Sequence, residues 1–295
     1  MAFEYVILDF AMNNADRIRI VTSGWSYPRG EGTWNGDFYP PRIKSELEYY
    51  SRFFNTVEVN STFYRPPDPH VSEGWQEKPP TDFSSRLNCG RNSPSGHVPR
   101  GNGRGGGDIR RRRRNFQDRF RPAGEKRQTG SALSPVPSQF HRRRLRQTDF
   151  EGDLNTFTEY RLAVELRHKS WSDDPCTAEI LIEHNACWVQ IDEPKFDFSI
   201  ASEVPPTSDI SYFRFHDRNA EMWWKGDVET RYMYLYSEAG INQLAQKVAG
   251  ANANSTLTFA FFNNHYKANA SRNARDLVRA LQVPFNNSMD FRLPE

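Results

Sequence analysis

The sequence predicts an α/β fold, a (β/α)8 barrel of the TIM type whose third and fourth βα units are disrupted, forming one domain over residues 1–295. Short apolar strands alternate with helical patterns, as in parallel sheets covered by helices. Each strand pattern ends in polar and aromatic residues. Residues 61–160 show no strand pattern, and a gap of this length is unusual in a compact domain. Two further βα units would fill the gap and bring the number of units to eight.

The individual elements follow from hydrophobic periodicity and length, because strands are short apolar runs and helices are longer and amphipathic. The expected strands are residues 18–23, 56–60, 161–167, 187–192, 210–216 and 256–263. The expected helices are residues 43–53, 69–77, 177–185, 230–249 and 267–281.

The cysteines and the first residues predict a cytoplasmic protein. Cys89, Cys176 and Cys187 have no ligand-like spacing, which argues against a disulfide framework or a zinc site. Residues 1–20 contain acidic residues within their apolar stretch and no basic leader, unlike a signal peptide. No segment has the length of a membrane span, so we expect no membrane partner.

The charge of the chain is concentrated in residues 84–147, which carry 17 Lys and Arg against 3 Asp and Glu. This segment includes Arg110 to Arg114, holds 9 of the 18 glycines and has neither Trp nor Tyr. One interpretation is a genuine basic arm on a non-catalytic protein that associates with nucleic acid. Binding of that kind would weaken steeply with salt.

Polar residues at the strand ends are expected to meet at the carboxyl end of a parallel barrel, where active sites of this fold lie. Side chains alternate along a strand, so Leu162, Val164 and Leu166 should face helices while Glu165 and Arg167 face inward. The same alternation directs six further side chains inward: Glu58, Asn60, Gln190, Asp192, Arg214 and His216. Isolated buried charges are costly, so this set should be paired internally or serve a ligand.

Five motifs in register carry a resemblance to a known family. They are residues 22–28 with 38–40, 53–64, 163–171, 212–216, and 261–265 with Ala270, Asn273 and Ala274. The chain resembles the YecE-like family (domain of unknown function 72) over residues 18–83 and 154–281. The resemblance implies a barrel and a polar site, and it implies no established reaction or cofactor.

Residues 84–153 depart from the family, which should show Ala-Lys-x-Pro, Thr-His and Phe-Gln-x-Pro-Pro-Ser-Phe motifs there. Residues 128–148 can be encoded so that a one-base shift yields Val-Gln-Phe-Pro-Pro-Ser-Phe, and residues 89–101 shifted alike resemble the missing third strand. Two matches in one frame and in the right order favour a frame-shifted, non-native segment at about 84–150. Nucleic acid is then not an expected partner.

Four residues are candidates for catalysis. Glu58 and Glu165 could act as a general acid and a nucleophile or base, or could simply neutralise arginines inside the barrel. Asp192 would orient another group, and His216 could act in catalysis or as an electrostatic clamp. Asp192 and His216 with a Glu could also hold a divalent cation, but no ligand spacing indicates one, so we predict no metal site.

The expected ligand is a small polar molecule, sugar-like or anionic and bearing a phosphate. Arginine suits anion binding, although internal ion pairs explain these guanidiniums equally well. Aromatic side chains past the strand ends could stack on a ligand or could close the top of the barrel. The predicted ligand-binding residues are Trp25, Tyr27, Asn60, Tyr64, Arg167, His168, Trp171, Arg214, Asn263 and Asn264.

Overall fold

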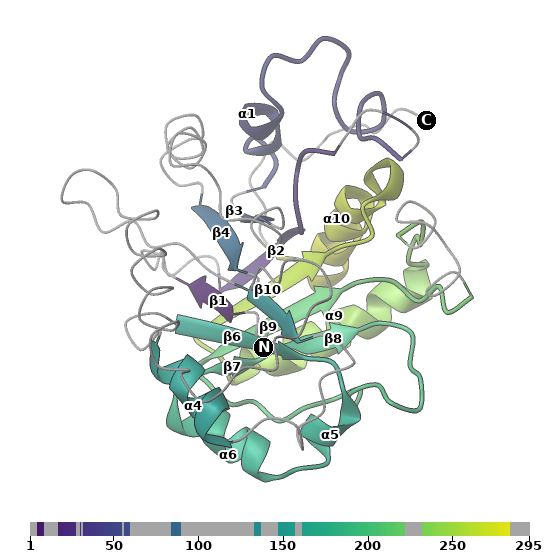
Figure 1. Cartoon of the computed structure of the whole chain (residues 1–295). Helices are drawn as coiled ribbons and strands as arrows, with labels where there is room; N and C mark the ends of the chain where they lie inside the picture. Colours follow the sequence, from purple (N-terminus) through teal and green to yellow (C-terminus); the bar gives the residue numbers. More distant parts are fainter. Residues whose placement is uncertain are drawn as a thin grey trace, which may run out of the picture.

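The computed structural model describes residues 5–8, 17–27, 30, 32–54, 56–59, 84–89, 133–136, 147–156, 161–221 and 232–283 (Figure 1). Its strands are β1 Tyr5–Leu8, β2 Ile18–Thr22, β3 Thr56–Val59, β4 Ser84–Cys89, β5 Leu133–Val136, β6 Arg161–Leu166, β7 Cys187–Trp188, β8 Gln190–Asp192, β9 Ile210–Phe215 and β10 Leu257–Phe262. Its helices are α1 Glu46–Tyr50, α4 Gln147–Thr156, α5 Lys169–Ser172, α6 Cys176–Glu183, α9 Glu238–Ala253, the 3-10 turn η3 Tyr266–Ala268 and α10 Asn269–Leu281. The fold is therefore α/β.

The strands form two sheets. In the first, β2, β10, β9 and β8 pair in that order, all parallel. In the second, β6 pairs parallel with β5 and β7, and β3 pairs parallel with β4. The amide of Gly24 donates to the carbonyl of Glu58 at 2.8 Å and joins the end of β2 to β3. A ring of eight parallel strands is not closed among the described residues, because β1 pairs antiparallel with both β4 and β6.

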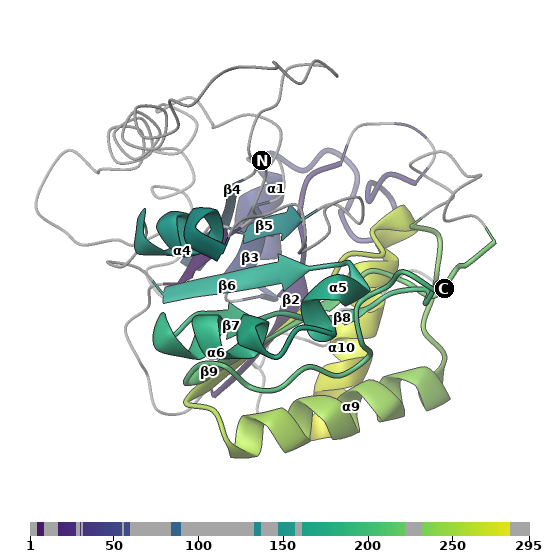
Figure 2. The same cartoon turned by 60° about the horizontal axis from the view of Figure 1, so that its bottom comes forward.

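Helices cover the outside of the sheets. Figures 1 and 2 show α9 and α10 side by side along the four-stranded sheet, with α6 next to β7. Helix α9 begins where the side chain of Ser237 accepts a hydrogen bond from the amide of Gly240. Its apolar side buries Ile241, Leu244 and Val248, which fixes this helix against the sheet.

Aromatic side chains cover the inward face of the four-stranded sheet. The ring of Tyr212 in β9 lies 4.9 Å from that of Phe261 and 5.6 Å from that of Phe259, both in β10. These side chains are fully buried. Arg214 is two residues after Tyr212 in β9, so both side chains lie on the same face of the sheet. In register, Phe261 of β10 lies opposite Arg214. An apolar layer thus lies directly beneath the charged strand ends.

All six strands expected from the sequence are present, with Val189 dividing residues 187–192 into β7 and β8. The helix expected at 43–53 is confined to Glu46–Tyr50, and the one expected at 230–249 begins only at Glu238. The helix expected at 69–77 lies outside the described residues. Within residues 61–160, where no strand pattern was found, β4 pairs parallel with β3 and β5 pairs parallel with β6. None of the helices in the described ranges is both long and apolar enough to cross a membrane.

Candidate functional site

A chain of alternating carboxylates and guanidiniums lies at the carboxyl ends of the strands. Arg214 donates from Nη2 to Glu58 Oε2 at 2.9 Å and from Nη1 to Glu165 Oε2 at 2.6 Å. Arg167 donates from Nε to Glu165 Oε1 at 2.6 Å and from Nη1 to Glu193 Oε2 at 3.1 Å. We call these five residues, which come from β3, β9, β6 and the ends of β6 and β8, the charged cluster.

Two neutral side chains extend the charged cluster. Tyr212 Oη donates to Glu58 Oε1 at 2.9 Å, so both oxygens of that carboxylate are bound. His216 Nε2 lies 3.1 Å from Arg167 Nη2, and its Nδ1 lies 3.0 Å from Asn263 Nδ2. Nε2 also lies 3.6 Å from Glu165 Oε1, so this ring nitrogen faces both a guanidinium and a carboxylate.

Burial and neighbouring charge fix the protonation states. Burial opposes the charge of Glu165, but the guanidiniums of Arg167 and Arg214 outweigh it and hold the pKa of Glu165 well below its usual range. Burial, followed by the positive charge of Arg167, lowers the pKa of His216 to about 3. Burial raises the pKa of Glu193, although Arg167 opposes this shift. At neutral pH the cluster therefore contains a fixed carboxylate and an uncharged imidazole.

Arg167 is the most accessible member of the charged cluster. Its side chain is 19% exposed, whereas those of Glu58, Glu165 and Arg214 are between 0% and 3% exposed. The inner pairs are therefore closed to solvent, and a molecule that reached the cluster would meet Arg167 first. Glu193, with a side chain 6% exposed, lies beside it.

Asp192 does not join the charged cluster, contrary to its expected inward position. Register places Asp192 opposite Phe215 and Ile191 opposite Arg214, so Asp192 faces the outer side of the sheet. There it forms a bidentate pair with Arg218, with Nε–Oδ2 2.9 Å and Nη2–Oδ1 3.0 Å, and accepts from Tyr236 Oη at 2.7 Å. Register also places Cys187 opposite Ala163, on the face of Glu165, so alternation continues unbroken through β7 and β8. The sequence prediction took the opposite phase, because it assigned the polar Asp192 rather than the apolar Ile191 to the inward face.

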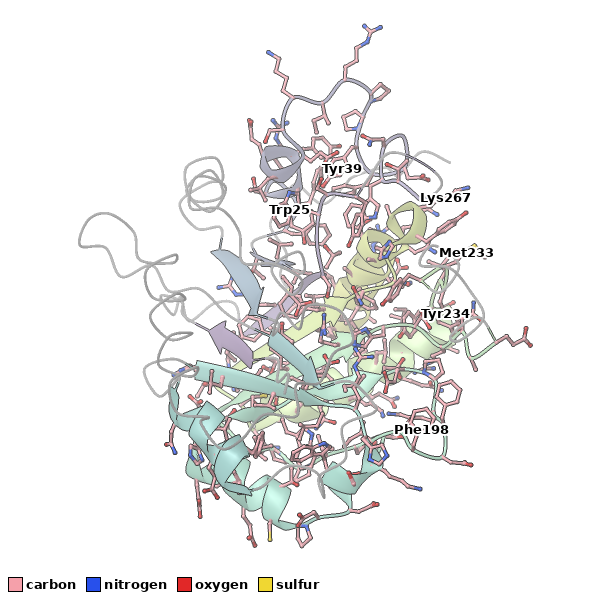
Figure 3. The ribbon with its side chains drawn as sticks, viewed as in Figure 1. Trp25, Tyr39, Phe198, Met233, Tyr234 and Lys267 are labelled. Atoms are coloured by element: carbon pink, nitrogen blue, oxygen red, sulfur yellow. The ribbon has the colours of Figure 1, made fainter. Side chains whose placement is uncertain are left out.

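The expected ligand-binding aromatic residues lie in different surroundings. Trp171 is fully buried and packs against Phe150 with ring centroids 5.2 Å apart. Tyr27 is half-buried and stacks on His265 at 4.5 Å. Trp25 is half-buried, and its carbonyl accepts a hydrogen bond from Tyr39; Figure 3 shows both above the sheets.

Of the remaining predicted site residues, two bond to the backbone and two lie outside the described residues. His168 caps α5, because its Nδ1 accepts from the amide of Ser170 at 3.1 Å. Asn264 donates to the carbonyl of Tyr234 at 2.8 Å and thereby holds the segment before α9. Asn60 and Tyr64 lie outside the described residues. Within those residues no group of three His, Cys, Asp or Glu side chains is arranged to hold a metal ion.

Two members of the site, Tyr212 and Glu193, are absent from the sequence prediction. Tyr212 precedes Arg214 by two positions, so strand alternation already places both on one face. Glu193 directly follows β8, at a strand end where polar residues were expected, and its position in the polar run Asp192-Glu193 was the available signal.

Comparison with known proteins gives a consistent result. A family model described as a protein of unknown function, DUF72, matches residues 19–294. The UPF0759 protein YunF of Bacillus subtilis is 23% identical over 263 residues, which are 84% of this chain and 91% of that protein. A solved DUF72 family structure from Thermotoga maritima aligns with a TM-score of 0.70 and 29% identity, covering 90% of this chain and 99% of that one. Another, from Enterococcus faecalis, aligns with a TM-score of 0.70 and 20% identity, covering 90% and 96%.

Proposed function

The chain belongs to the DUF72 family of proteins of unknown function, and on this premise we propose that it is a (β/α)8 barrel that binds a small, polar, sugar-like ligand at the carboxyl ends of its strands. The observation that carries the proposal is the charged cluster. Five ionisable side chains from four places in the chain meet where barrels hold their active sites. Burying them costs several kcal/mol per ion before pairing, a cost that a purely structural strand end would not require.

Strand pairing supports the barrel. If β7 and β8 count as one interrupted strand, the order β10, β2, β3, β4 on one side and β5, β6, β7/β8, β9, β10 on the other contains eight strands that are parallel to their partners. The junction between β4 and β5 is then the one place, among the described strands, where parallel pairing is missing. This junction falls within the basic segment.

A frame-shifted segment at about 84–150 is part of this proposal. The family model extends through the segment, and the interrupted junction between β4 and β5 lies inside it. The coding DNA across residues 83–154 tests it directly. If the DNA encodes residues 83–154 in the same reading frame as the rest of the chain, and no sequencing error is found, the frame shift is refuted. The basic arm would then again be a candidate for nucleic-acid binding.

The bonding of the guanidiniums favours a sugar-like ligand over a phosphate-bearing one. The terminal nitrogens of Arg214 are bound to Glu58 and Glu165, and the nitrogens of Arg167 contact Glu165, Glu193 and His216. An anion would have to displace these carboxylates, whereas a hydroxyl group can both donate to a carboxylate and accept from Arg167. Small hydroxylated molecules therefore fit the cluster without breaking it.

The two-carboxylate chemistry considered for Glu58 and Glu165 is disfavoured by the same contacts. Both oxygens of each carboxylate are bound, and the low pKa of Glu165 prevents it from donating a proton near neutral pH. We assign Glu58 and Glu165 an electrostatic role that holds Arg214 and Arg167 in place. His216, as an uncharged imidazole beside Arg167, is the remaining catalytic candidate of the cluster.

The free thiols Cys176 and Cys187 accord with a cytoplasmic location.

Thermal denaturation with glucose and glucose 6-phosphate tests the proposal. We expect glucose at millimolar concentration to raise the melting temperature and Arg167→Met to abolish this rise, because that side chain is the accessible donor of the cluster. Arg52→Met, which removes a 60% exposed guanidinium near α1, is the matched control and should keep the response. An equal response in Arg167→Met, or a response to glucose 6-phosphate alone, would refute the proposed ligand class.

A further inference from the structure

Glu193 differs from the other two carboxylates of the charged cluster in its bonding. Glu58 and Glu165 each use both oxygens in contacts with Tyr212, Arg214 or Arg167. Glu193 uses Oε2 toward Arg167 at 3.1 Å, and Oε1 accepts no hydrogen bond from the residues that the structure describes. The residue is 8% exposed, so an acceptor stands next to the most accessible member of the cluster with half of its capacity in use.

The charges of the cluster do not balance. Three carboxylates share two guanidiniums, and His216 is uncharged. Arg167 divides its nitrogens between Glu165 and Glu193, so the excess negative charge falls at the outer end of the cluster, on Glu193. A buried carboxylate is stabilised by a close cation, and a charge-assisted hydrogen bond is stronger than a neutral one.

We propose that Glu193 binds an ammonium group of the ligand, so that the molecule taken up at the charged cluster is an amine-bearing, hydroxylated compound of the amino-sugar class. This inference rests on the proposed function and specifies its ligand. The ammonium would donate to Glu193 and make the numbers of positive and negative groups equal, while the hydroxyl groups would reach Arg167. Glu193 is thereby a ligand-binding residue, and Arg167 serves both the cluster and the ligand.

Four other charged groups act on Glu193, and among the described residues only Arg167 bonds to it. From β6 these are Arg167 and Glu165, and from β8 and the segment after it they are Asp192 and Lys195. Asp192 is already paired with Arg218, and the exposed Lys195 donates its Nζ to the carbonyl of Ile200 at 3.3 Å. Burial raises the pKa of Glu193, as expected for a carboxylate whose charge is incompletely compensated.

Three sugars that share one ring test the inference: glucosamine, glucose and glucose 6-phosphate, which carry an ammonium, no charge and a phosphate. With the full chain at neutral pH, we expect glucosamine to produce a given rise in melting temperature at about one tenth of the glucose concentration, as one charge-assisted hydrogen bond predicts. Glucose 6-phosphate should produce no rise. In Glu193→Gln, glucosamine should act no better than glucose.

The control is Glu183→Gln, which removes an exposed carboxylate at the end of α6 and should keep the preference for glucosamine. If Glu193→Gln does not fold, the comparison of the three sugars on the unmodified chain still decides. Equal effects of glucose and glucosamine, or a preference that persists in Glu193→Gln, would overturn the ammonium site and leave the proposed function standing. No response to any of the three sugars would overturn both.

Discussion

Two arginine–carboxylate clusters lie on opposite faces of β8 and β9. On the inner face Arg214 joins Glu58 and Glu165, and on the outer face Arg218 forms a bidentate pair with Asp192. The geometry of the contacts is similar, with nitrogen–oxygen distances between 2.6 and 3.0 Å. The exposure differs: Arg214 is 3% exposed and the side chain of Arg218 is 32% exposed.

The outer pair behaves as a reinforced surface ion pair. Asp192 also accepts from Tyr236, and the guanidinium of Arg218 lies 5.4 Å from the centre of the Tyr236 ring. Arg218 donates in addition to Gln243 of α9, so the pair ties the end of β8 to this helix. Water screens the charges, and the Coulomb energy of the pair is correspondingly small.

The inner cluster has no such screening. Loss of one partner from a buried pair leaves a charge without water or a counter-ion, which destabilises the fold strongly. Loss of one partner from the outer pair leaves a charge that water can solvate. Only the inner cluster holds Glu165 as a fixed anion and His216 as a neutral ring. Contact geometry alone would not distinguish a structural pair from a candidate site, whereas burial does.

The largest expected effect comes from removing the central guanidinium. Arg214→Met retains much of the apolar stem but leaves Glu58 and Glu165 buried without their shared cation. We expect the free energy of unfolding to fall by about 3–5 kcal/mol, measured by urea denaturation followed by circular dichroism. A loss below about 1 kcal/mol would mean that the inner cluster is solvated as freely as the outer pair.

An intermediate effect is expected from the neutral imidazole. The folded pKa of His216 is about 3 and its ordinary value is 6.5, so its contribution to stability is complete above pH 6.5 and is lost as the pH falls toward 3. Between pH 6.5 and 4.5 this loss amounts to roughly 2–3 kcal/mol, at about 1.36 kcal/mol per pH unit. His216→Gln should therefore be less sensitive to acid over this interval, as urea denaturation at several pH values would show.

Below pH 4.5 the parent and His216→Gln should both lose stability. The pKa of Glu165 is lowered by Arg167 and Arg214, so its contribution is present above the ordinary value of 4.5 and is lost as the pH falls further. Parallel stability curves for the two proteins between pH 6.5 and 4.5 would show that His216 is not held neutral.

The sequence predicted the residues of the inner cluster better than those of the outer pair. Glu58, Glu165, Arg167, Arg214 and His216 were all placed inward by strand alternation, and the structure brings them into contact. The pattern sufficed because β6 and β9 are uninterrupted strands of six residues, over which the two-residue period keeps its phase.

The outer pair and the helix starts needed tertiary information. Asp192 was misplaced because its polarity was taken to mark the inward face, whereas register places the apolar Ile191 opposite the inward Arg214. The start of α9 was also expected too early, since residues 232–236 are not helical in the structure. The sequence does contain a signal for the true start, because the side chain of Ser237 caps the helix. The partner of Asp192, Arg218, lies beyond the end of β9 where no periodicity applies.

The smallest effect is expected from Arg218→Met, which removes the guanidinium of the outer pair. Water can reach both partners, whose side chains are 32% and 20% exposed, so the unpaired Asp192 carboxylate becomes hydrated and still accepts from Tyr236. The free energy of unfolding should fall by no more than about 1 kcal/mol, and raising the salt concentration should narrow the difference from the parent. Arg214→Met and Arg218→Met replace the same residue type on opposite faces of β9 and its extension, so their difference reports burial together with the second carboxylate that Arg214 bonds. A loss in Arg218→Met as large as that in Arg214→Met, unaffected by salt, would show that the link from Asp192 to α9 stabilises the fold as strongly as the inner cluster does.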